Sequence, residues 1–285
     1  MEGLEKLTRE DREAFKFLHI HGNNSEFSLN QVSHHLVSVA KGSLDNYKYV
    51  NKFGRAIGFG TSIVDINDQA TPGVYTWLQA EDTVNVVSSA ASDAAGGAGA
   101  RTIIVQGLDG DFDEVEEEIT LDGANPVTST QKFIRVHRAY IGDTGSYAKT
   151  NAGTQTGNIT VTDTTSGGVQ IYLNGVLRVG QSFVARYTIP RNWTGYLFDA
   201  NATARSLKAT SFFLWRREGA DVVSAPYTPK RAIDARTGIV SQIFATWEIP
   251  IKLPEKTDIW MSAQGDAAGS DATGGFTILL VRNET

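Results

Sequence analysis

The chain has 285 residues, no cysteine and a formal net charge of −6. Without cysteine it forms neither disulfide bonds nor thiolate metal sites, which fits assembly in a reducing cytoplasm. Its basic residues are scattered rather than clustered, so the composition argues against a nucleic-acid partner.

The N-terminal residues 1–18 carry charges where a signal peptide has an apolar core. No apolar run approaches the ~20 residues of a membrane span, so we expect no membrane insertion.

Two short helices are predicted in the N-terminal region. Residues 8–20 begin with Thr8 as an N-cap and with acidic residues in the first turn. Residues 28–42 carry apolar side chains at helical spacing and end at Gly42. Neither helix is long enough to be stable alone, so residues 1–50 form either an attachment element for another protein or a helical cap over the body.

The next segments alternate between turns and short strands. Residues 47–71 have the composition of a turn-rich linker, whose glycines suggest bends or close backbone contacts. Strands are predicted at residues 74–78 and 83–87. Residues 90–100 form a loop of small residues whose Gly97-Ala98-Gly99 precedes a strand, so no helix N-terminus is present there to bind a pyrophosphate.

Residues 101–141 are the most strongly patterned part of the chain. Three strand-like runs are separated by two clusters of turn residues, which predicts a β-meander. In residues 115–121 the apolar side chains alternate with polar ones, although Glu117 falls on the apolar face. One face of this sheet is therefore expected to pack on a core.

Further short strands follow at residues 158–161, 169–173, 182–189, 195–198, 211–216, 239–249, 259–263 and 276–281. About twelve short strands and few helices predict a mainly β protein with an antiparallel β-sandwich or jelly-roll body. This body spans residues 51–285, either as one domain or as two sub-domains, 51–150 and 151–285. The pattern does not show which strands pair.

Several motifs in the body resemble a virion-associated module of marine tailed bacteriophages. They are Asn51-Lys52-Phe53-Gly54-Arg55, Val87-Ser88-Ser89, Asp93, Gly99-Ala100-Arg101-Thr102, Gly107-Leu108-Asp109, Arg135-Val136-His137-Arg138-Ala139-Tyr140, Gly180-Gln181-Ser182, Tyr187-Thr188-Ile189-Pro190, Thr194-Gly195-Tyr196 and Pro254-Glu255-Lys256-Thr257-Asp258-Ile259-Trp260. The resemblance covers roughly residues 51–282 and implies a structural protein of a phage particle, of the decoration, fibre or tail-associated type. It brings no catalytic residues with it, and residues 1–50 lie outside it.

Two groups of residues are candidate metal ligands. Asp109, Asp111 and Asp113 have the alternating spacing of a calcium loop, but Glu114 stands where that loop needs glycine and Thr120 where it needs a bidentate acid. A hairpin with carboxylates on its solvent face explains them better. His19 and His21 would bring six nitrogen ligands around the axis of a trimer, but polar helix ends explain them more simply. We therefore expect no metal and no cofactor.

The five tryptophans could form a platform for sugar stacking. Four of them lie in strand-like runs, where core packing is commoner. Trp193 lies in the turn-like segment 190–195 and is the candidate for an exposed glycan contact.

The sequence thus predicts a non-enzymatic bacteriophage virion structural protein, made in the host cytoplasm and located in the virion. Its N-terminal region would dock onto the capsid, portal or tail, and a homo-oligomer, here a homotrimer, is expected. The alternative is a host-glycan-binding, receptor-binding module of a tail fibre. A glycan hydrolase is a third hypothesis, but the acidic residues lack a recognised catalytic spacing.

Overall fold

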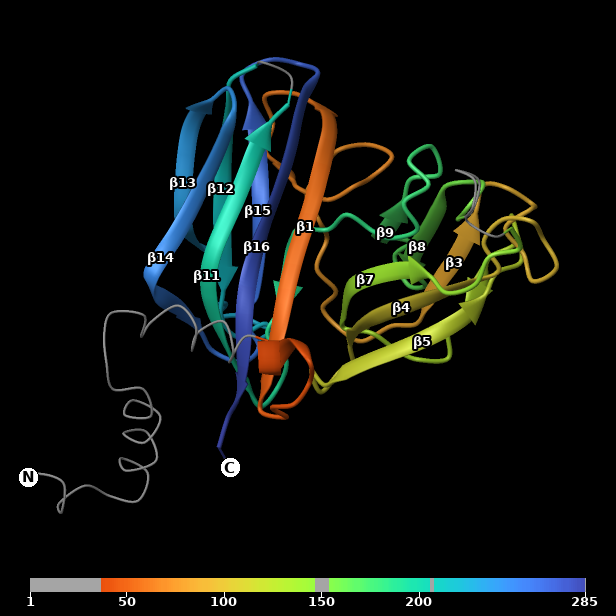
Figure 1. Cartoon of the computed structure of the whole chain (residues 1–285), viewed down its shortest axis with the longest axis horizontal. Coiled ribbons are helices and arrows are strands. Elements are labelled where there is room, and N and C mark those ends of the chain that lie inside the picture. The colour runs from red at the N-terminus through yellow and green to blue at the C-terminus, as the bar shows by residue number, and fades with distance from the viewer. Residues whose placement is uncertain (1–36, 147–153, 206–207, 285) are drawn as a thin grey trace, which may run out of the picture. The chain divides into compact units, whose positions relative to one another are not determined.

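The computed structural model describes residues 37–146, 154–205 and 208–284 (Figure 1). The chain divides into two compact units, Met1–Lys48 and Tyr49–Thr285. In the first unit, residues 37–40 form a single helical turn within the second predicted helix. The helix predicted at residues 8–20 lies outside the described residues, as do His19 and His21.

The described residues form sixteen strands. They are β1 (Tyr47–Phe59), β2 (Val64–Asp65), β3 (Val84–Ser88), β4 (Thr102–Leu108), β5 (Glu114–Thr120), β6 (Val127–Thr128), β7 (Arg135–Ile141), β8 (Ile159–Asp163), β9 (Val169–Leu173), β10 (Arg186–Thr188), β11 (Trp193–Ala204), β12 (Thr210–Arg217), β13 (Arg231–Ile239), β14 (Gln242–Leu253), β15 (Asp258–Gly265) and β16 (Ser270–Arg282). The prediction of a mainly β, antiparallel, sandwich-like protein is confirmed. Of the part of the chain that the structure describes, no helix has the length and apolar character that crossing a membrane requires.

Strands from both ends of the second unit form one sandwich, here called the discontinuous sandwich. One sheet has the order β1-β16-β11-β14, and the other has the order β10-β15-β12-β13 with β2 paired to β15. Figure 1 shows β1 beside β16, although these strands come from opposite ends of the unit. Alternate side chains such as Leu197 on β11 and Leu214 on β12 meet in one core between the sheets.

The strands β3 to β9 form a second sandwich, here called the inserted sandwich. Its sheets have the orders β6-β3-β8-β9 and β5-β4-β7. Val86 on β3, Val161 on β8 and Val105 on β4 belong to a second core, separate from the first. The division into 51–150 and 151–285 does not match these sheets, because β8 pairs with β3 and β9 pairs with β8, so both belong to the sheet of the earlier strands.

The prediction of a turn-rich linker at residues 47–71 is wrong, because this segment contains β1 and β2. The buried side of β1 presents Lys52, Gly54 and Ala56, so the strand shows no alternation of large apolar residues. Gly54 does make one of the close backbone contacts that the glycines of this segment predict. A Cβ atom at this position would lie 2.0 Å from the carbonyl oxygen of Ile66.

Three other strand predictions are corrected. Residues 101–141 are not a meander, because β7 pairs with β4 instead of β5, while the intervening β6 pairs with β3 in the other sheet. Residues 74–78 form no strand, and the backbone N–H of Tyr75 donates to the Asp65 carboxylate at 2.7 Å. Residues 239–249 span the end of β13 and the start of β14, which belong to different sheets.

Candidate functional site

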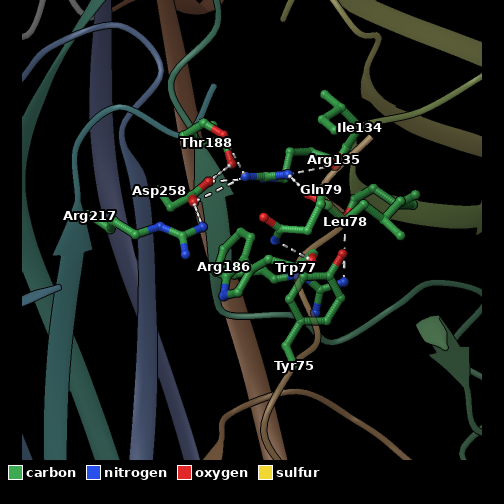
Figure 2. Close-up of polar contacts among 12 residues, drawn as sticks. Tyr75, Trp77, Leu78, Gln79, Ile134, Arg135, Arg186, Thr188, Arg217 and Asp258 are labelled. Carbon is green, nitrogen blue, oxygen red and sulfur yellow. Dashed lines mark hydrogen bonds and ion pairs between the residues drawn. The ribbon is translucent and has the colours of Figure 1, made fainter. Parts of the chain in front are cut away.

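A buried ion pair joins the two sandwiches of the second unit. Arg135 begins β7 and Asp258 begins β15, and their side chains are 2% and 0% exposed. The Nε atom of Arg135 donates to Oδ1 of Asp258 at 3.0 Å, and Nη2 donates to Oδ2 at 3.2 Å. This fork geometry is the strongest form of an arginine–carboxylate contact (Figure 2).

The other polar atoms of this pair also have partners. Nη1 of Arg135 donates to the carbonyl oxygens of Leu78 and Ile134 at 3.0 and 2.8 Å. The hydroxyl of Thr188 donates to Oδ1 of Asp258 at 2.7 Å, and Arg217 forms a second ion pair with Oδ2. A buried charge pair is stable only when its remaining hydrogen-bonding capacity is met, as it is here. The cluster therefore holds the structure together and leaves neither member of the pair free for chemistry.

A second arginine also spans the two sandwiches. Arg186 on β10 donates to the carbonyl oxygens of Val136 and Gln170, which lie on β7 and β9. Its guanidinium lies 3.6 Å from the centroid of the Tyr75 ring, and the Tyr75 hydroxyl bonds to Gln170. Burial lowers the pKa of Arg186, and the neighbouring Tyr75 and Asp65 oppose that shift.

A cleft of about 530 Å³ opens beside this cluster. Trp77 contacts both the ion-pair cluster and the cleft. The guanidinium of Arg135 lies 5.0 Å from its ring centroid, and Trp77 also lines the cleft. The cleft is lined by aromatic residues and by a few polar ones, namely Tyr75, Trp77, Tyr227, Trp260, Asp65, Arg217, Lys230 and Ser262. An aromatic cleft with a few convergent polar groups is typical of a ligand site.

Asp65 supplies the carboxylate of this cleft. Its Oδ1 accepts from the Ser262 hydroxyl and its Oδ2 accepts from the N–H of Tyr75, both at 2.7 Å. Burial raises the pKa of Asp65, and these two hydrogen bonds partly offset that rise. Glycoside hydrolysis needs a second carboxyl group about 5–10 Å away. No other Asp or Glu is among the described residues that line the cleft.

A second cavity, of about 470 Å³, contains groups with shifted pKa values. Burial, together with the charges of Arg186 and Arg138, lowers the pKa of Lys52 to about 7. Burial also holds the pKa of His137 well below its usual value, and that of Tyr187 well above. The Nζ atom of Lys52 donates to the carbonyl oxygen of His137 at 2.6 Å, which ties this lysine to the backbone of β7.

The predicted metal candidates that can be located form a turn. Oδ1 of Asp109 accepts from the N–H groups of Asp111 and Asp113, each at 3.0 Å. Arg191 forms ion pairs with Asp111 and Asp113. Across the described ranges, no group of three His, Asp or Glu side chains is arranged to hold a metal ion.

Trp193 is not an exposed contact. It is the first residue of β11, is 8% exposed and packs in the core of the discontinuous sandwich. The turn precedes it, at Asn192, whose φ is +64°. The tryptophans that do line the 530 Å³ cleft are Trp77 and Trp260, which the sequence analysis assigns to strands. No signal in the sequence distinguished them from core tryptophans.

Comparisons with known proteins find no matching family model and no matching curated protein. Among solved structures, that of the infectious bursal disease virus Gx strain has 13% identity and a TM-score of 0.25, covering 83% of this chain and 72% of that chain. A mutant VP2 protein of infectious bursal disease virus in derived T=1 particles has 12% identity and a TM-score of 0.25, covering 83% and 70%. A likeness at this TM-score carries no weight for fold or function.

Proposed function

We propose that this chain is a non-enzymatic structural protein of a bacteriophage virion. The support comes from where the residues that carry the resemblance lie. Arg135, Thr188 and Asp258 belong to three separate motifs of the resemblance and meet in one buried, hydrogen-bonded cluster. At these positions the motif residues connect the two sandwiches, and this structural role supports the proposal.

Asp93 gives a second case of the same kind. It is fully buried and accepts hydrogen bonds from the Ser88 hydroxyl and from the N–H groups of Ala100, Thr156 and Gly157, at 2.6 to 2.9 Å. It therefore orders the small-residue loop on either side of it. Ser88, Asp93 and Ala100 all lie within the motifs of the resemblance, and again their role is architectural.

In this proposal the first unit docks onto the capsid, portal or tail, and the second unit presents the two sandwiches. The particle contains the protein as a homotrimer, either as a capsid decoration or as part of a tail fibre, and its partners are other copies and other virion proteins. Weak contacts gain strength when symmetric copies bind together, which favours a closed oligomer on the particle.

The test is a cryo-EM map of the purified particle at side-chain resolution, with quantitative mass spectrometry of the same sample. We expect density that fits the two sandwiches, arranged around a symmetry axis, at a fixed copy number. Purified particles that lack the chain would overturn the proposal. Release of product from host envelope polysaccharide by the pure protein would overturn the non-enzymatic assignment.

A further inference from the structure

We propose that the cleft lined by Trp77, Tyr227 and Trp260 binds a pyranose ring of an acidic glycan. This inference goes beyond the structural role, and it does not depend on Trp193. It rests on the shape, the aromatic lining and the charge of the cleft.

The lining offers apolar surface that is open to a ligand. Tyr227 is 60% exposed, and Val74 and Val222 are also exposed at the cleft. Trp77 is half-buried. The C–H groups on one face of a pyranose ring match an aromatic surface, while its hydroxyl groups remain free for hydrogen bonds. The volume of about 530 Å³ lies within the range of small-molecule sites.

The aromatic floor is held rigid before any ligand arrives. The Trp77 ring packs edge-on against Tyr75 at 4.9 Å and against Trp260 at 5.4 Å between centroids. Tyr75 and Trp260 are both buried, and Arg135 lies over Trp77 from the ion-pair cluster. A preformed floor loses little conformational entropy on binding, so stacking on it contributes more to affinity.

The charges of the cleft select an acidic ligand. Lys230 places its Nζ atom 4.5 Å from the centroid of the Trp215 ring, and none of the ion pairs found in the described segments includes it. Arg217 also lines the cleft, and its guanidinium pairs on one side with Asp258. The acid in the lining, Asp65, already accepts two hydrogen bonds. A carboxylate on the sugar would therefore meet the ammonium of Lys230 and the guanidinium of Arg217, beside the Asp65 carboxylate, whose charge Lys230 partly offsets.

The experiment is titration calorimetry of the full chain with a short oligomer of galacturonic acid and with a glucose oligomer of the same length. We expect saturable binding of the acidic oligomer and binding of the neutral one that is about tenfold weaker or less. Tyr227→Ala and Lys230→Gln should each weaken binding of the acidic oligomer by about tenfold.

The matched controls lie on β14. Phe244→Ala removes an aromatic ring that is 70% exposed, and Lys252→Gln removes an exposed lysine. Both variants should bind the acidic oligomer as the wild type does. If Tyr227→Ala unfolds, Lys230→Gln still decides the matter, because its side chain is at the surface.

Several results would overturn the inference. They are the absence of saturable binding of the acidic oligomer, unchanged affinity in both cleft variants, or equal losses in the β14 controls. Equal affinity for the neutral oligomer would overturn the acidic class. None of these results bears on whether the chain is present in purified particles, so the two proposals fail separately.

Discussion

Asp258 holds more charged partners than any other carboxylate in the described part of the second unit. It forms ion pairs with both Arg135 and Arg217 and is fully buried. Asp258→Asn keeps the shape of the side chain but leaves both guanidinium groups without a counter-charge. Removing one partner of a buried pair typically destabilises a protein by about 3–5 kcal/mol. We expect a loss of this size in the free energy of unfolding, measured by urea denaturation.

Asp113 provides the matched control at the surface. It pairs with Arg191, and both side chains are more than a third exposed. Solvent screens such a pair, so Asp113→Asn should change the free energy of unfolding by less than about 1 kcal/mol. Similar losses in the two variants would show that the Arg135–Asp258 cluster does not stabilise the junction.

Lys52 makes the free energy of unfolding increase with pH above about pH 7. Its pKa is about 7 in the folded chain against 10.5 for an ordinary lysine. Between these values the unfolded chain holds a proton that the folded chain has released. Stability therefore rises with pH across this window, with a slope of up to about 1.4 kcal/mol per pH unit, and is lost as the pH falls from 10.5 towards 7.

Lys52→Met removes this titration and also the hydrogen bond to the His137 carbonyl. The lost hydrogen bond shifts the free energy of unfolding equally at every pH, so the slope is the informative quantity. Between pH 7.5 and 9.5 we expect the wild type to gain about 1–3 kcal/mol relative to the variant. Urea denaturation at several pH values measures this, and parallel curves for the two proteins would contradict it.

His137 acts in the same direction at lower pH. Its pKa is held well below 6.5 by burial and by nearby cations. As the pH falls below 6.5, His137 binds a proton in the unfolded chain but not in the folded chain, so the free energy of unfolding falls. The free energy of unfolding of each protein is expressed relative to its own value at pH 8. On this scale His137→Gln should lose stability at lower pH than the wild type does. An unchanged acid midpoint on that scale would contradict this assignment.

Among the elements, β1 depends on a close approach that only glycine allows. A Cβ atom at Gly54 would lie 2.0 Å from the Ile66 carbonyl oxygen and 2.6 Å from the Ala185 nitrogen. Both contacts are with backbone, so they cannot be relieved by turning a side chain. Gly54→Ala should destabilise the chain by at least about 2 kcal/mol. Circular dichroism during thermal unfolding measures the change.

Gly60, just after β1, serves as the control. A Cβ atom there would find nothing closer than the Ala268 Cα at 4.0 Å. Gly60→Ala should therefore stay within about 0.5 kcal/mol of the wild type. If the two alanine variants unfold at the same temperature, β1 is not held by this contact.

The contrast between β5 and β1 explains which elements the sequence predicts. On β5, Val115 and Ile119 alternate with exposed acids, and this alternation predicts the strand. Glu117 lies on the same face because its carboxylate accepts from the backbone N–H groups of Thr130 and Gln131. On β1 the alternating buried positions are a lysine, a glycine and an alanine, and the one large apolar residue that is buried, Phe59, ends the strand, so β1 gives no alternating hydrophobic signal.

The candidate cleft was harder to predict than the strands. Tyr75 and Trp77 alternate as in a strand, but the segment pairs with no strand, because Asp65 takes the N–H of Tyr75. Trp193 follows turn residues, yet β11 begins at Trp193 itself and turns its ring into the core. Exposure of a tryptophan depends on the neighbouring strands, which no local pattern specifies.

At the scale of the molecule, the arrangement of the two sandwiches follows from pairings between distant residues. β3 pairs with β8, and β1 lies beside β16. Local turn and strand signals carry no information on such pairings. The sequence therefore does not predict where one sandwich ends and the other begins, and a division at residue 150 differs from the observed sheets. The inserted sandwich lies between β2 and β10 in the sequence, so a single cut within it leaves β1 and β2 on one fragment and β10 to β16 on the other, joined only by the pairing of β1 with β16 and of β2 with β15 and by the shared core.

The division at Lys48 and Tyr49 gives the last prediction, which concerns the first unit. A chain that starts at Tyr47 keeps β1 whole and loses the residues proposed to dock onto the particle. We expect it to unfold at the same temperature as the full chain, since the two cores are intact. It should nevertheless be missing from particles assembled in its presence, as measured by mass spectrometry against the full chain. Normal incorporation would show that attachment lies in the second unit, whereas a lower unfolding temperature would support the alternative that residues 1–50 cap the body.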